Sequence, residues 1–193
     1  MKKSTKLIIT ALICVAIFVG IYFLYGVLKE NYTPNQFSDV TQNTSKVTDE
    51  YESEQVDTKA KDFKVFDENG NEVKLSDFFG KPIVLNFWAT WCYYCREEMP
   101  DFNDAYHNNP DVQFLMVNVT DGRRETVFSA KQYVDDSDFD FTVLYDKNLD
   151  ATTTYGAWGL PMTVFIDKDG NYVNHASGML DAENLKRGID LIK

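Results

Sequence analysis

Residues 83–95 have the sequence IVLNFWATWCYYC, an apolar run followed by two cysteines. The run from Ile83 to Trp88 has the length and the β-branched and aromatic content of a buried strand. The segment after it, residues 93–107, has the pattern of a helix. The C-x-x-C therefore falls between a strand and a helix, which is typical of a reactive thiol pair.

The spacing of Cys92 and Cys95 suits thiol-disulfide exchange. It places Cys92 at the N-terminus of the predicted helix and Cys95 one turn later on the same side. Unpaired backbone N–H groups and the helix dipole stabilise a thiolate at that position, and such thiols have pKa values of about 3.5–7.5. We expect Cys92 to attack a substrate disulfide, and Cys95 to resolve the mixed disulfide by attacking Cys92.

Two other uses of the cysteine pair fit the sequence less well. A zinc site needs four ligands, but the remaining cysteine, Cys14, lies in an apolar N-terminal run. Of the two histidines, His107 is expected at the far end of the predicted helix and His175 on an edge strand. A purely structural disulfide across four residues would gain little loop entropy. Redox chemistry is therefore the favoured interpretation, and no metal ligands are predicted.

Alternating strand and helix patterns predict one α/β domain over residues 61–193. A hairpin is expected first, with the turn Asp67–Gly70 between two short strands at 63–66 and 72–75. Further strands are predicted at 112–119, 139–145, 162–166 and 172–175, and further helices at 123–134, 148–155 and 181–192, the last capped by Asp181. The expected architecture has three layers, with a mixed central sheet flanked by helices.

The N-terminus is predicted to be a membrane anchor. Lysines within residues 1–6 precede an uncharged apolar run at residues 7–28. The 22 residues of that run would extend roughly 33 Å as a helix, enough to cross a bilayer. A cleaved signal peptide is the alternative, but the run contains no A-x-A-like site, and Ile13 before Cys14 does not suit a lipoprotein signal. The positive-inside rule places residues 1–6 in the cytoplasm and the chain beyond the anchor outside the membrane.

The predicted exterior part begins with a polar segment and is strongly acidic. Residues 29–60 are mostly polar and have no sustained periodicity, so a flexible tether is expected there. The whole chain has a formal net charge of −11, and residues 31–193 hold 15 basic and 29 acidic residues, a net charge of −14. This charge disfavours nucleic-acid partners. No haem-binding or nucleotide-binding motif is visible, so no cofactor is predicted.

The segment FWATWCYYC at residues 87–95 resembles the active-site segment of thioredoxin-like proteins. Two further segments make the resemblance closer to the membrane-anchored TlpA/ResA branch of thiol-disulfide oxidoreductases. One contains LSD and GKP at residues 75–82, and the other is GLPMT at 159–163, followed by FID at 165–167. The resemblance covers about residues 61–193 and implies a thioredoxin-like fold for them.

The resemblance also implies roles for individual residues. Cys92 would be the nucleophile and Cys95 the resolving thiol. The bond between Leu160 and Pro161 would be cis and would face the cysteines, exposing neighbouring backbone to a bound peptide. Trp91 precedes the nucleophile, so the expected substrate-binding residues are Trp91, Leu160 and Pro161.

Glu98 matches a glutamate that the TlpA/ResA branch places near its cysteines. A partly buried carboxyl there would accept the proton that Cys95 must lose, although a plain acidic residue of the first helical turn, favoured by the helix dipole, is the alternative. Two positions differ from thioredoxin itself. Asn86 replaces a buried aspartate and cannot carry a proton, and the dipeptide between the cysteines is Tyr93–Tyr94, without the usual proline. That dipeptide tunes the redox potential, so the sequence leaves the direction of electron flow open.

The leading hypothesis is an extracytoplasmic, membrane-tethered thiol-disulfide oxidoreductase. The resemblance suggests a reductant of exported proteins that keeps apocytochrome cysteines reduced in cytochrome c maturation. It would be recharged by a membrane electron donor of the CcdA or DsbD type, because cytoplasmic thioredoxin does not cross the membrane. The alternatives are a thiol oxidase or disulfide isomerase for exported proteins and, in another class, a non-catalytic binding or chaperone module.

Overall fold

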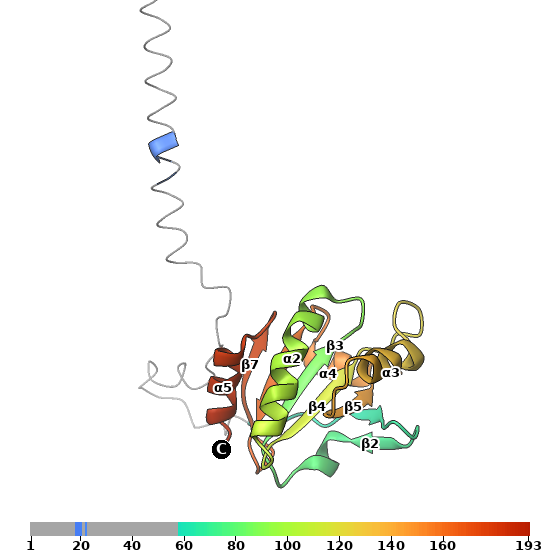
Figure 1. The fold of residues 1–193 in the computed structure, drawn as a ribbon. Coiled ribbons are helices and arrows are strands. Elements are labelled where there is room, and N and C mark those ends of the chain that lie inside the picture. Colours follow the sequence, from blue (N-terminus) through green and yellow to red (C-terminus); the bar gives the residue numbers. More distant parts are fainter. Residues whose placement is uncertain (1–17, 21, 23–57) are drawn as a thin grey trace, which may run out of the picture. The chain divides into compact units, whose positions relative to one another are not determined.

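The computed structural model describes residues 18–20, 22 and 58–193 (Figure 1). Residues 18–20 and 22 are helical, and among all the described residues no helix is both long and apolar enough to span a membrane. The predicted cytoplasmic segment 1–6, most of the predicted anchor 7–28 and the tether up to residue 57 lie outside the described residues. The fold is therefore that of residues 58–193.

Seven strands and four α-helices follow one another along residues 58–193. In chain order they are β1 (Lys64–Phe66), β2 (Glu72–Lys74), the 3₁₀-helix η2 (Leu75–Phe78), β3 (Ile83–Trp88), α2 (Tyr93–Asn108), β4 (Gln113–Asn118), α3 (Val127–Asp136), β5 (Thr142–Tyr145), α4 (Asp150–Tyr155), β6 (Met162–Ile166), β7 (Tyr172–Ser177) and α5 (Ala182–Asp190). The predicted α/β class is confirmed, and so is the N-terminal hairpin, in which β1 pairs with β2.

The strands form one mixed sheet in the order β2-β1-β5-β4-β3-β6-β7. The pairs β3–β4 and β4–β5 are parallel, whereas β3–β6 and β6–β7 are antiparallel. The strand before the cysteines, β3, therefore lies inside the sheet with a paired neighbour on each side. It is buried on both faces, as its uninterrupted apolar run predicts.

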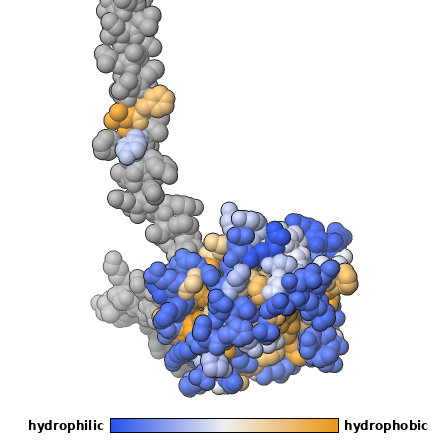
Figure 2. Space-filling view, viewed as in Figure 1, coloured by the Kyte–Doolittle hydropathy of each residue, from blue (hydrophilic) through white to orange (hydrophobic). Residues whose placement is uncertain are grey.

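Alternate residues of β3 face opposite layers of the domain. Val84 and Trp88 belong to the core cluster that includes residues of α2, α3 and α5, while Leu85 and Phe87 belong to a second cluster with Ala151 of α4. Helices thus cover both faces of the sheet, which gives the expected three layers (Figure 1). The surface seen in Figure 2 is mainly hydrophilic, because the apolar residues of the strands are inside.

Two predicted elements differ from those observed by three residues or more at one end. The helix expected at 123–134 begins only at Val127, where Thr126 caps it by accepting a hydrogen bond from the Ser129 N–H. The residues before it form a loop, because the Asp121 carboxylate accepts the N–H groups of residues 123–125 and so stabilises a non-helical backbone. The strand expected at 139–145 is shorter and covers Thr142–Tyr145.

The described residues include three that precede the predicted domain, residues 58–60. Lys59 forms an isolated β-bridge with Asn171, and Ala60 is buried in the second core cluster. Both residues fall within the segment 29–60 expected as a tether. The turn at Asp167–Gly170 holds this segment, since the Ala60 N–H donates to the Gly170 carbonyl at 2.9 Å.

Candidate active site

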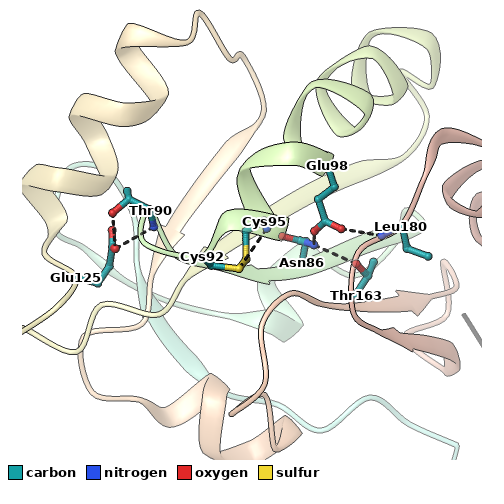
Figure 3. Close-up of a disulfide and its surroundings, with 8 residues drawn as sticks. All are labelled: Asn86, Thr90, Cys92, Cys95, Glu98, Glu125, Thr163 and Leu180. Carbon is teal, nitrogen blue, oxygen red and sulfur yellow. Dashed lines mark hydrogen bonds between the residues drawn. A yellow bond between two sulfur atoms is a disulfide. The ribbon is translucent and has the colours of Figure 1, made fainter. Parts of the chain in front are cut away.

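The two cysteines lie where β3 passes into α2. A tight turn connects the two elements, with a hydrogen bond of 3.1 Å from the Cys92 N–H to the Ala89 carbonyl. Cys92 is the N-cap of α2, and its Sγ accepts a hydrogen bond of 3.2 Å from the Cys95 N–H. Cys92 and Cys95 are joined by a disulfide with Cα atoms 5.3 Å apart (Figure 3). The predicted placement of the pair at a helix N-terminus is confirmed.

The two sulfur-bearing residues differ in their access to solvent. Cys92 is 6% exposed and Cys95 is fully buried. An incoming disulfide therefore reaches Cys92 more easily than Cys95. This asymmetry supports Cys92 as the attacking thiol and Cys95 as the resolving one, the assignment that the spacing predicts.

Glu98 lies one turn after Cys95 on α2, with its carboxyl group buried beneath the surface. It is only 1% exposed and lies beyond the first turn of α2, so it is not the plain first-turn residue of the alternative interpretation. Its Oε1 accepts from the Asn86 side-chain amide and its Oε2 from the Leu180 N–H, both at 2.8 Å (Figure 3). The predicted carboxyl near the cysteines is therefore present, and it is more deeply buried than the sequence suggested.

The surroundings of Glu98 favour its neutral form. Burial raises the pKa of the Glu98 carboxyl to about 8, and the Asp101 carboxylate adds a smaller rise. The hydrogen bonds from Leu180 and Asn86 oppose this pKa shift, because they stabilise the charged form. A group with a pKa near 8 exchanges protons with a thiol at little cost, since an ordinary cysteine has a pKa of about 8.5.

Asn86 connects β3 to both Glu98 and β6. Its Nδ2 donates to Glu98 Oε1 and, at 3.0 Å, to the hydroxyl of Thr163. Its buried Oδ1 has no hydrogen-bond partner among the described residues. If the amide were reversed, Oδ1 would instead accept from a protonated Glu98 and from the Thr163 hydroxyl. Asn86 thus suits both charge states of the carboxyl, a role that the sequence did not reveal.

The other predicted site residues are Leu160, Pro161 and Trp91. The peptide bond between Leu160 and Pro161 is cis, as expected, and the Pro161 carbonyl accepts from the Gly178 N–H at 2.9 Å. Leu160 packs against both core clusters, one of which contains the two cysteines. Trp91 is 42% exposed directly before Cys92. Their roles in binding a substrate remain predictions.

Exposed aromatic side chains occur within the C-x-x-C segment itself. Tyr93 and Tyr94 are 58% and 60% exposed, and their ring centroids lie 5.4 Å apart. Trp158, just before the GLPMT segment, is 67% exposed, so it does not pack in the core. The two tyrosines between the cysteines are therefore open to solvent.

One buried acidic residue near the cysteines was missed by the sequence analysis. Glu125 is fully buried and accepts hydrogen bonds from the N–H and the hydroxyl of Thr90, two residues before Cys92. It was missed because residues 123–134 were assigned to a helix with no sign that this carboxyl would be buried. Within the part of the chain that the structure describes, no three His, Cys, Asp or Glu side chains gather in a way that would hold a metal ion.

Comparison with known proteins agrees with this geometry. The AhpC/TSA family profile matches residues 56–175. The thiol-disulfide oxidoreductase ResA of Bacillus thuringiensis subsp. konkukian (strain 97-27) is 34% identical over 137 residues, 70% of this chain and 77% of the relative. ResA of Geobacillus kaustophilus (strain HTA426) is also 34% identical, over 72% of this chain and 78% of its own.

A solved structure extends the likeness to three dimensions. The putative thiol:disulfide interchange protein DsbE from Chlorobium tepidum matches with a TM-score of 0.61 and 30% identity, over 68% of this chain and 92% of its own. The expected thioredoxin-like fold is thereby confirmed. The chain belongs to the AhpC/TSA family, within which it is a thiol-disulfide oxidoreductase of the ResA/DsbE type.

Proposed function

We propose that this protein is tethered to the outer face of a cell membrane, where it reduces disulfides in exported proteins. The observation that carries the proposal is the cysteine pair at the start of α2, with Cys92 as the more accessible sulfur and the buried Glu98 carboxyl one turn beyond Cys95. Such an arrangement supplies both a stabilised thiolate and a proton acceptor.

The reaction begins with the reduced pair. The Cys92 thiolate attacks one sulfur of the substrate disulfide, the substrate S–S bond breaks, and its second sulfur leaves as a thiolate that takes a proton from solvent. The Cys95 thiol then transfers its proton to the ionised Glu98 and attacks Cys92 Sγ. The mixed disulfide breaks, and the substrate sulfur that Cys92 attacked leaves as a thiolate that takes a proton from solvent, while Glu98 returns its proton to solvent. The substrate is then a dithiol, and the protein holds the Cys92–Cys95 disulfide after giving up two electrons.

The pKa of Glu98 decides when this carboxyl acts as a base. With a pKa of about 8, most of the carboxyl is protonated at neutral pH and the ionised fraction rises through pH 8. In the reverse direction the protonated form returns the proton to Cys95 as its sulfur leaves. The same group therefore serves both halves of the cycle.

The location outside the membrane is supported by the sequence. Residues 7–28 are apolar and uncharged, residues 29–60 are polar, and the chain from residue 31 onward carries a net charge of −14. A reductant in that location needs electrons delivered through the membrane, so the proposed partner is a membrane electron donor of the CcdA or DsbD type. The likeness to ResA makes apocytochrome c, in cytochrome c maturation, the first candidate substrate.

The reduction potential of the Cys92–Cys95 pair tests the direction of electron flow. It is measured on the full chain in detergent, by equilibration with glutathione redox buffers. A potential near or below about −250 mV supports a reductant. A potential near about −120 mV, as in DsbA, would instead identify a thiol oxidase. A double Cys92→Ser, Cys95→Ser variant is the control, and a variant that kept the cellular function would point to the non-catalytic binding module.

The proposed location is tested separately in intact cells. A membrane-impermeant thiol reagent should label Cys92 after mild reduction, and an added protease should digest the domain without cell lysis. If both reagents acted only after lysis, the proposed orientation would be wrong.

A further inference from the structure

The turn that carries Cys92 is held by a neighbouring loop. Thr90 and Trp91 are the two central residues of this turn, which the hydrogen bond from the Cys92 N–H to the Ala89 carbonyl closes. Consecutive residues of the loop after β4 contact them. Glu125 binds Thr90, and the Arg124 guanidinium lies over the Trp91 ring, 3.8 Å from its centroid.

Of the two contacts, the one between Glu125 and Thr90 is the stronger. Glu125 Oε2 accepts both the N–H and the hydroxyl of Thr90, at 2.9 and 2.7 Å (Figure 3). Its Oε1 accepts from the Asn118 amide at 3.2 Å and from the Ser129 hydroxyl at 3.4 Å. Burial of a carboxylate is costly unless donors surround it. These donors come from the turn, from the end of β4 and from the first turn of α3.

The loop itself is fixed at its own start. The Asp121 carboxylate accepts the N–H groups of Arg123, Arg124 and Glu125 at 2.8, 2.8 and 3.0 Å. Gly122, between Asp121 and Arg123, has a φ of +71°, a conformation that other residues rarely adopt. These contacts fix the backbone at Glu125 independently of Thr90. The hydrogen bonds between Glu125 and Thr90 therefore constrain the turn as well as the loop.

We propose that Glu125 and Thr90 form a positioning pair for Cys92. The pair acts through the turn: it keeps Cys92 at the N-cap of α2, where backbone N–H groups and the helix dipole stabilise its thiolate. The inference rests on the thiol-disulfide chemistry of the cysteines and not on the direction of electron flow. Neither residue is assigned contact with the substrate.

The fold contains a matched pair away from the cysteines. Asp146 is also fully buried, and its Oδ2 accepts the N–H and the hydroxyl of Thr152 at 2.8 and 2.7 Å. This pair anchors the start of α4, on the opposite face of the sheet. The two pairs share their chemistry and a fully buried carboxyl, while Thr90 is partly buried and Thr152 fully buried, so the second pair is a stringent control for loss of stability.

The test compares Thr90→Val and Thr90→Ser with Thr152→Val and Thr152→Ser. All are made in the full chain in detergent, with Cys14→Ala and Cys95→Ser, so that Cys92 is the remaining thiol. The pKa of Cys92 is read from the pH dependence of its alkylation by iodoacetamide. Thr90→Val should raise it by at least about half a unit, a threefold loss of thiolate relative to thiol. Thr90→Ser, which keeps the hydroxyl, should have the same Cys92 pKa as the protein with Thr90.

The control pair separates positioning from general stability. Thr152→Val should lower the free energy of unfolding at least as much as Thr90→Val and leave the pKa of Cys92 unchanged. Equal pKa changes in the two valine variants, or no change in either, would overturn the proposal. If Thr90→Val does not fold, Thr90→Ala replaces it, because it removes the same hydroxyl and adds no methyl group.

Glu125→Gln distinguishes position from charge. It removes a buried negative charge and keeps a carbonyl oxygen for Thr90, so a purely electrostatic Glu125 would give a lower Cys92 pKa in this variant and no change in Thr90→Val. That combination would also overturn the positioning pair. If the unmodified protein exchanged no disulfides at all, the proposed function would fail first, independently of these comparisons.

Discussion

Replacing Glu98 by glutamine is expected to remove a large pH dependence of stability. In the folded protein the Glu98 pKa is raised from 4.5 to about 8, so the native state retains a proton that the unfolded chain loses above pH 4.5. The associated stability is fully present below pH 4.5 and is lost as the pH rises through 8. Integration of this difference from pH 5 to pH 8 gives a loss of about 3.5 kcal/mol for one such group.

The assay is chemical denaturation of the oxidised full chain in detergent, followed by tryptophan fluorescence at several pH values between 5 and 9. Keeping the disulfide closed removes the titrations of Cys92 and Cys95, and Cys14 is common to both proteins. Burial lowers the pKa of His175, but that residue titrates alike in both proteins and cancels in the difference. The wild-type protein should lose about 3.5 kcal/mol more than Glu98→Gln between pH 5 and pH 8. A difference below about 1 kcal/mol would show that the carboxyl titrates near its ordinary range.

Three further outcomes are expected. Cys95→Ser should accumulate a mixed disulfide between Cys92 and a substrate protein, seen by mass spectrometry, and an equal yield from Cys92→Ser would contradict the assigned order of attack. Glu98→Gln should slow the decay of the mixed disulfide about 10²-fold at pH 7 in rapid-quench experiments, whereas an unchanged rate would mean that water takes the proton. Gly188→Ala places a Cβ in steric clash with the outer edge of the Phe165 ring and should lower the free energy of unfolding by about 1–3 kcal/mol. A gain of about 1 kcal/mol, as on an exposed helix, would show that the ring moves aside.

The elements next to clear sequence boundaries could be predicted from the sequence alone. Strand β6 has the predicted bounds, because Pro161 and the turn at Asp167–Gly170 delimit an apolar run. Asp181 caps α5 as expected, with its side chain accepting from the Asn184 N–H. These signals lie within a few residues of the structure they determine, so no tertiary information is needed.

The candidate site was predictable only where a local motif carried it. The cysteines were found from their spacing and from the strand before them. The full burial of Glu98 was not, because its partner Leu180 lies 82 residues further along the chain. Glu125 was missed for the same reason: its donor Thr90 is 35 residues away, and an acidic residue in a polar stretch has the composition of a solvated helix.

The interior position of β3 has a consequence for how often the site is disturbed. All six of its residues, Ile83–Trp88, are buried, and the five residues Ile83–Phe87 are paired on both sides. Hydrogen exchange at such central amides requires opening events nearly as costly as global unfolding. The turn that carries Cys92 directly follows this strand, so the reactive cysteines adjoin a segment of the sheet that rarely opens. Deuterium should therefore remain excluded from β3 over many rounds of oxidation and reduction.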